Sequence, residues 1–159
     1  MNSGMGIPPP FTTPTTKSRS KLLLWLSLLG LGILLLVALL GRGAFRNYKL
    51  ASAAVDHFHQ QLDQGDYDAI YDGASDEFHR SSDRLTVVKF MGKVHERMGN
   101  SSKASSAGFH VNWRNGHTFV DEVLKTQFFS GQAQETFIWI SEQDQLRLYS
   151  YHIDSPNIH

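Results

Sequence analysis

The longest apolar stretch of the chain runs from Leu22 to Leu40 and reads LLLWLSLLGLGILLLVALL. Its 19 residues carry no charge, and Ser27 supplies the only hydroxyl group. As a helix the stretch would be about 28 Å long, which is close to the hydrocarbon thickness of a bilayer. Because a helix pairs its own backbone groups in lipid, the pattern predicts one transmembrane helix over residues 21–41.

The segment before this span, residues 1–20, is dominated by proline, threonine, serine and glycine, and it is expected to form a disordered cytoplasmic tail. A cleaved signal peptide is the alternative interpretation of the apolar run. The run is longer than the apolar core of a signal peptide, which spans about 7–15 residues, so an uncleaved anchor is favoured. Basic residues flank both sides of the span. The domain that follows is nevertheless expected outside the cytoplasm, as is common for folded domains after a first anchor.

Apolar residues then recur at helical spacing up to residue 98. The first stripe repeats every four residues and consists of Leu50, Ala54, Phe58 and Leu62. It predicts a helix over residues 48–64 that ends at Gly65. A short helix is expected over 67–72 with Asp66 as its N-cap, and a turn of helix or a packed loop over 75–78. A second stripe consists of Val87, Met91, Val94 and Met98. It predicts a helix that has Ser82 as its N-cap and stops at Gly99.

The period of the pattern changes to two after the polar segment 100–106, which is expected to be a connection. Phe109, Val111 and Trp113 alternate with polar residues, and Asn115-Gly116 is a strong hairpin signal. Three further strands are expected, at residues 118–129, 133–140 and 146–153. The apolar residues of the second strand do not keep one parity, which favours a β-bulge near Asp121-Glu122.

Helices followed by a four-stranded meander are typical of an α+β domain. We therefore expect about three helices packed on a curved four-stranded antiparallel sheet over residues 47–154, with a short tail at 155–159. A sheet bent by a bulge would curl around the first helix into a cone and leave a pocket or groove between them.

Charge is unevenly distributed along the 159 residues. The first 46 residues carry five basic residues and no acidic one, whereas residues 47–159 carry ten basic residues against all fifteen acidic ones. An acidic domain lacks a surface that neutralises phosphates, so nucleic acid is not an expected partner. The absence of cysteine excludes disulfides, thiolate zinc sites and a cysteine nucleophile.

Eight histidines raise the question of a metal site. His57 and His59 are two residues apart on a predicted helix, so their side chains diverge, and no histidine pair has the spacing of metal ligands. Surface histidines, or histidines satisfied by structural hydrogen bonds, are the favoured interpretation. No metal or cofactor is expected.

The most informative polar residue is Glu135, because it shares strand parity with Phe137 and Trp139. If that face points inward, Glu135 lies inside the cone and needs a hydrogen-bond donor, for which Tyr71, His110 and Tyr149 are candidates. A structural role is favoured over a histidine–carboxylate acid/base pair. Aromatic and polar residues of the same elements could instead line a ligand pocket. These candidates are Tyr67, Tyr71, His110, Trp113, Glu135, Trp139, Tyr149 and Tyr151.

The run Phe58-x3-Leu62-Asp63-x-Gly65-Asp66-Tyr67-x3-Tyr71-x3-Ser75-x2-Phe78 resembles the opening of a bacterial membrane-anchored domain of unknown function. That domain belongs to the nuclear transport factor 2-like, cystatin-like superfamily. Arg97-Met98-Gly99 and the closing Tyr151-x-Ile153 continue the resemblance, whereas Ser150 departs from the glycine that members often have there. The resemblance implies a cone-shaped α+β fold and no particular activity.

The expected function is that of a single-pass protein of the bacterial inner membrane with a periplasmic or extracellular binding or scaffolding domain. Inner-membrane scaffolds of type IV secretion systems are similar in plan. The bilayer would be one partner, and a protein of the cell envelope or a second copy in a homodimer fits as another. Two alternatives stay open: a binder of small apolar ligands, and a hydrolase, isomerase or dehydratase-like enzyme. No catalysis is expected, because no acid/base constellation stands out.

Overall fold

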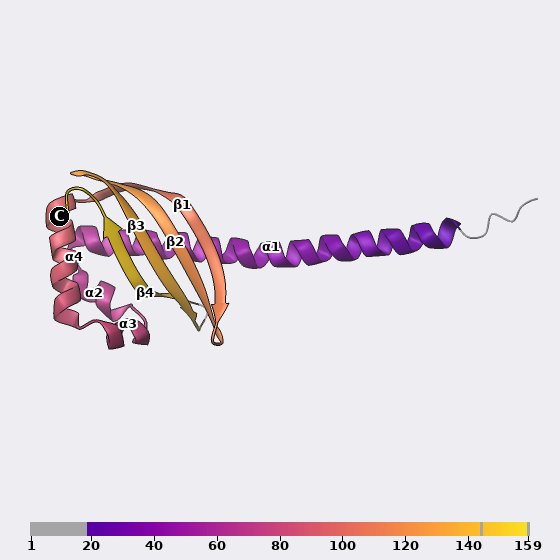
Figure 1. Ribbon diagram of the computed structural model, residues 1–159, viewed down its shortest axis with the longest axis horizontal. Coiled ribbons are helices and arrows are strands. Elements are labelled where there is room, and N and C mark those ends of the chain that lie inside the picture. The colour runs from indigo at the N-terminus through magenta and orange to yellow at the C-terminus, as the bar shows by residue number, and fades with distance from the viewer. Residues whose placement is uncertain (1–18, 144, 159) are drawn as a thin grey trace, which may run out of the picture. The chain divides into compact units, whose positions relative to one another are not determined.

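A computed structural model describes residues 19–143 and 145–158 (Figure 1). The chain divides into two compact units, residues 1–40 and 41–159, and each is considered by itself. The predicted tail lies mostly outside the described residues, but Arg19 and Ser20, which were expected to be disordered, are helical.

Helix α1 spans Arg19–Gln64 and therefore runs through the predicted membrane segment into the helix predicted at 48–64. In the first unit, the large apolar side chains described between Leu23 and Val37 are all exposed, by 54–74%. The side chains of Leu22, Leu39 and Leu40 are outside the described set. Within residues 19–143 and 145–158, no helix has an apolar window long enough to be assigned as a membrane crossing.

The end of α1 and the start of α2 (Tyr67–Asp72) follow the predicted capping pattern. Gly65 has a φ of 74°. Its N–H donates to the carbonyl of Leu62 at 3.1 Å, and the N–H of Asp66 donates to the carbonyl of Gln61 at 2.9 Å. This pair of bonds is a Schellman motif. Asp66 then caps α2 by accepting a hydrogen bond from the N–H of Ala69 at 3.3 Å.

Two further helices follow, α3 (Asp76–Ser81) and α4 (Arg84–Met98). The predicted N-cap Ser82 is wrong by one residue, because the carboxylate of Asp83 accepts the hydrogen bond from the N–H of Thr86 at 3.0 Å. The second stripe is confirmed, since all four of its residues are buried. Gly99 ends α4 with a φ of 69°, as predicted.

Strands β1 (Ser101–Arg114), β2 (His117–Phe128), β3 (Gly131–Glu142) and β4 (Gln145–Asp154) form one antiparallel sheet in the order β1-β2-β3-β4. The α+β fold and the meander are thus confirmed. The connection predicted over 100–106 is wrong, because β1 already begins at Ser101. Its first half is exposed on both faces, so no apolar alternation could signal the strand there.

The predicted bulge at Asp121-Glu122 is also wrong, because β2 pairs with β3 without interruption. The irregularities lie in the two edge strands, at Ser102 and Ala107 of β1 and at Tyr149 of β4, which have no partner in the register. The parity of β2 misled the prediction because Glu122 is on the inner face, whereas the apolar Phe119 is on the outer face.

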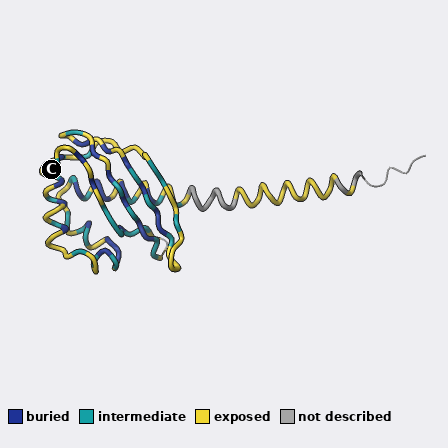
Figure 2. The backbone as a smooth tube through the Cα atoms, in the orientation of Figure 1, coloured by how far each residue is buried: buried dark blue, intermediate teal, exposed yellow. Residues whose placement is uncertain are grey.

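The core of the second unit lies between the inner face of the sheet and the helices, and its buried strand positions are on β2, β3 and β4, whereas β1 has none (Figure 2). Phe58 of α1 packs against Phe137 of β3 with ring centroids 5.0 Å apart. The end of the chain is bound to the same unit. The hydroxyl of Ser155 donates to the backbone carbonyl of Gln132 at 3.1 Å. The side-chain amide of Asn157 donates to the backbone carbonyl of Ser130 at 2.7 Å.

Candidate functional site: a buried carboxylate network

Glu135 occupies the middle of β3, where alternate residues point into the core. It is 0% exposed, and its strand neighbours on the same face, Ala133 and Phe137, are buried too. The inward orientation predicted from parity is therefore confirmed. A buried carboxylate is stable only if its oxygens accept hydrogen bonds, so its partners decide what the group does.

Both carboxylate oxygens of Glu135 have a partner. Oε2 lies 2.8 Å from Nε2 of His59, and Oε1 accepts a hydrogen bond of 2.7 Å from the hydroxyl of Tyr151. His59 comes from α1 and Tyr151 from β4, so three elements meet at one side chain. We call these three residues the His59–Glu135–Tyr151 network.

The donors differ from the three that the sequence suggested. Tyr71 donates instead to the carbonyl of Ser82 at 3.2 Å. His110 is exposed, on the face of β1 opposite to Phe109. Tyr149, at the bulge of β4, packs its ring 5.2 Å from that of Phe119.

The spacing of His59 from His57 does not indicate its role, whereas its position on the helix does. It lies four residues after Val55 and three before Leu62, both of which are buried, so it belongs to the inward stripe of α1. Its ring also packs edge-on against Phe137, with centroids 6.1 Å apart. A histidine inside an apolar stripe was the signal that could have identified the partner of Glu135.

The predicted pocket residues do not come together as one group. Glu135 and Tyr151 are bonded, and Trp139 stacks on Phe137 with ring centroids 5.3 Å apart. The hydroxyl of Tyr67 forms a hydrogen bond of 2.8 Å with Nδ1 of His95. Trp113, by contrast, is exposed. Among the described hollows, none is lined by more than one of the eight candidates.

Two small apolar hollows touch the core. One, of about 150 Å³, is lined by residues that include Phe78, Val87, Phe90, Met91 and Tyr151. The other, of about 120 Å³, has Trp139 and Leu148 in its wall. A wider open groove of about 450 Å³ between α1 and β1 is mainly polar and includes Asp56 and His59. The apolar hollows are smaller than typical pockets for drug-sized ligands, which measure about 300–1,000 Å³.

A second inward carboxylate belongs to Glu122 of β2, which is 3% exposed. Its Oε2 has no hydrogen-bond partner among the described residues. Burial, and then the negative charge of Asp56, raise the pKa of Glu122 above its ordinary value. The sequence signal was present, because Glu122 shares parity with Val120 and Leu124.

In the His59–Glu135–Tyr151 network, each oxygen of Glu135 is paired with one side chain of the same unit. Burial, and then the charge of Glu135, raise the pKa of Tyr151 well above its ordinary value, so the phenol stays protonated and acts as a donor. Among the described residues, no three histidine, aspartate or glutamate side chains are grouped to hold a metal ion. The network fixes α1 to strands β3 and β4.

No protein-family model matches the chain, and no curated protein matches it. The resemblance to the nuclear transport factor 2-like superfamily therefore stays a prediction that rests on the residues quoted for it.

Proposed function

We propose that the chain is a single-pass protein of the bacterial inner membrane that presents residues 47–154 as a binding or scaffolding domain outside the cytoplasm. The observation that carries the proposal is the uncharged run Leu22–Leu40 together with the exposure of its described apolar side chains. A helix with exposed apolar side chains on all of its faces is stable where the surrounding medium is itself apolar. Lipid is such a medium.

The α+β architecture also supports membership of the nuclear transport factor 2-like superfamily, with a sheet that curls as a cone around the start of the domain. In this proposal the His59–Glu135–Tyr151 network has a structural role and does not serve as an active site. A general base must lie within hydrogen-bond reach of its substrate, whereas Glu135 is 0% exposed and each of its oxygens is paired with a side chain of the same unit. Recognition of a partner would then fall to the surface of the domain.

Reporter fusions test the location of the domain. An export-dependent reporter after His159 should be active and a cytoplasm-only reporter at the same position inactive, with the reverse result for fusions before Met1. Activity of the cytoplasm-only reporter after His159 would reverse the proposed topology.

Crosslinking in intact membranes tests the binding role. A defined partner, or a second copy, should be crosslinked to the full chain. It should be absent from the crosslinked products of a control chain that consists of residues 1–46 alone. Recovery of the same proteins with both chains would refute a binding role for the domain.

A small apolar ligand is the second candidate, because the hollow next to Phe90 and Tyr151 is open and apolar in part. A ligand present at about 100 times its Kd would stabilise the protein by about 2.7 kcal/mol, which a thermal-shift screen of the full chain in detergent detects. Phe90→Ala should abolish the shift, and the exposed Phe129→Ala serves as the control. A shift that is equal in both variants would place the ligand elsewhere.

A further inference from the structure

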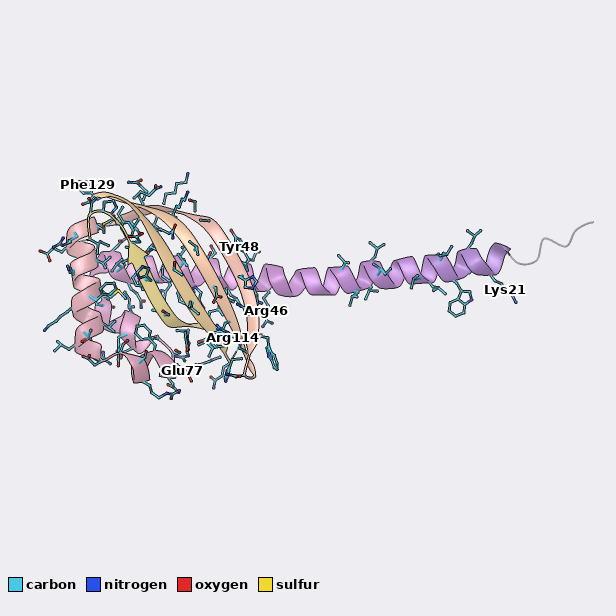
Figure 3. All side chains as sticks on the ribbon, in the orientation of Figure 1. Lys21, Arg46, Tyr48, Glu77, Arg114 and Phe129 are labelled. Atoms are coloured by element: carbon cyan, nitrogen blue, oxygen red, sulfur yellow. The ribbon has the colours of Figure 1, made fainter. Side chains whose placement is uncertain are left out.

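Strand β1 leaves one edge of the sheet open. In the order β1-β2-β3-β4, β1 and β4 are the two edges (Figure 1), and the edge of β4 is partly covered because the N–H of Ser75 donates to the carbonyl of Leu148 at 2.9 Å. Among the described residues, no backbone hydrogen bond joins residues 102–114 of β1 to a segment outside the sheet. β1 is 14 residues long and ends at Arg114, which lies at the opposite end of the domain from Phe129 (Figure 3). A long open edge of this kind can accept a strand from another chain.

The inner face of β1 has small side chains in its first half and large ones in its second half. Ala104 and Ser106 pair with buried residues of β2 and therefore lie on the inner face. The bulge at Ala107 shifts the alternation by one residue. Phe109 and Val111, whose partners in β2 are also buried, then take the inner face. Ala104, Ser106 and Val111 are exposed there, so the helices leave this face of β1 largely uncovered.

We propose that two copies of the chain pair through β1, antiparallel and about a two-fold axis between Ala107 and Gly108, and so join their four-stranded sheets into one continuous sheet. This inference rests on the proposed binding role of the domain and names a second copy as its partner. It concerns the second unit alone and does not depend on the membrane anchor. Addition of a strand to an open edge is a recurrent mode of protein association.

The position of the bulge permits this pairing. The register that overlaps both strands along all 14 residues places Ser101 opposite Arg114 and Ala107 opposite Gly108. In an unbroken strand of even length, this register would set inner side chains opposite outer ones, because neighbours alternate between faces. Bulges often protect an edge from pairing, but the one at Ala107 lies at the centre of the strand and removes this conflict. Between residues 103 and 112, inner residues therefore meet inner ones and outer residues meet outer ones.

The paired strands also match in side-chain size on the inner face. Phe109 of one copy lies opposite Ser106 of the second copy, and Val111 lies opposite Ala104. Each large side chain thus faces a small one, and the two-fold axis repeats both pairs. Val111, which is 37% exposed in a single copy, is covered in part by the second strand. Burial of this apolar area favours association.

The outer face adds a contact between opposite charges. Lys103 lies opposite Asn112 of the second copy, whose side-chain amide donates to Oδ2 of Asp121 at 3.1 Å. Oδ1 of the same carboxylate is buried and has no hydrogen-bond partner among the described residues. A lysine beside Asn112 brings a positive charge and a donor to this side of the carboxylate. The two-fold axis gives the contact twice.

Disulfide crosslinking tests the register, because the chain has no cysteine of its own. Ser105 and His110 are exposed residues of the outer face that lie opposite each other in the proposed pair. Opposed residues of antiparallel strands have Cα atoms about 4.5–5.5 Å apart, which a disulfide can bridge. Two differently tagged full-length chains, one Ser105→Cys and one His110→Cys, are coexpressed, purified in detergent and mildly oxidised. They should form a mixed disulfide.

Each cysteine variant alone should not crosslink, because its two copies of the same residue are about 17 Å apart along the paired strands. His152→Cys, at an exposed position of β4, replaces His110→Cys in the control and should give no mixed disulfide. Added to both chains, Lys103→Glu should lower the yield of the mixed disulfide about two- to fivefold, because it sets negative charges side by side. The exposed Lys89→Glu of α4 should leave the yield unchanged.

The outcomes separate this interface from the proposed function. A yield no higher than that of the His152→Cys control would refute the pairing through β1. If a second copy is nevertheless crosslinked to the full chain in membranes, the binding role stands and only the interface is refuted. Crosslinking of Ser105→Cys with itself, or an unchanged yield with Lys103→Glu, would also refute the proposed register. A mixed disulfide together with an active cytoplasm-only reporter would support the pairing and refute the location of the domain.

Discussion

At the scale of single residues, Glu135 joins three elements through one side chain. Its carboxylate accepts from Tyr151 and pairs with His59, and all three residues lie in a core of aromatic rings. Substitution of a buried hydrogen-bonded group costs more than the bond itself, because the partners left behind are desolvated and unpaired. The network should therefore matter more to stability than its number of bonds suggests.

The first prediction concerns Glu135. Glu135→Gln keeps the shape but cannot accept at both positions, so it should lower the free energy of unfolding by about 1–3 kcal/mol. Glu135→Ala should lower it further because it also opens a void. Denaturant unfolding measures both, with the exposed Glu96→Gln as a control expected to change it by less than about 0.5 kcal/mol. An equal free energy of unfolding for Glu135→Gln and wild type would show that the network does not contribute to stability.

Glu122 provides the second prediction, on pH dependence. Burial and Asp56 raise the pKa of Glu122 in the folded state, so its contribution to stability is fully present below the ordinary glutamate value of about 4.3 and is lost as pH rises through the folded value. Glu122→Gln removes the charge and should gain stability relative to wild type as pH rises from about 4 toward 7. Parallel unfolding curves across that pH range would mean that Glu122 is solvated.

At the scale of elements, capping residues and apolar stripes carried most of the predictive information. Gly65, Asp66 and Gly99 fixed the ends of helices through local backbone geometry, which a sequence encodes directly. The start of β1 was missed because an edge strand exposed on both faces has no apolar alternation.

The candidate site was only half predictable, for a different reason. The inward position of Glu135 followed from the period of its own strand. Its partners His59 and Tyr151 are 76 and 16 residues away in sequence, so the pairing depends on how α1 and β4 pack against β3. For Glu122 the signal was local, because it shares parity with Val120 and Leu124, but its polar side chain hid the true parity of β2.

The third prediction compares two glycines of the same helix region. Gly99 has a φ of 69°, and a Cβ there would lie 2.9 Å from Cβ of Phe129. Gly99→Ala should destabilise by about 1 kcal/mol or more, because it combines backbone strain with a close contact. In Gly92→Ala the new Cβ would meet the ring of Tyr67 at an ordinary 3.4 Å, and helix propensity should add up to about 1 kcal/mol. Thermal unfolding should shift in opposite directions, and a shift in the same direction would contradict the cap geometry.

At the scale of the whole molecule, two units of different character share one chain. The second unit has its own core, closed by the sheet, the helices and the residues that follow β4. The first unit contains the apolar run with exposed side chains, and among the described residues the core begins at Ala51. This separation fits a domain that folds independently of the segment proposed to hold it at the membrane.

The fourth prediction is the most direct test of the proposed anchor. Alkaline carbonate removes peripheral proteins from membranes and leaves integral ones, so the full chain should remain in the membrane pellet. An arginine near the centre of a membrane helix costs about 2.5–3.5 kcal/mol on insertion scales. Leu29→Arg/Leu34→Arg should therefore release the chain, whereas Ser52→Arg, at an exposed position in the second unit, should not. Recovery of the wild-type chain in the carbonate supernatant would contradict the membrane anchor.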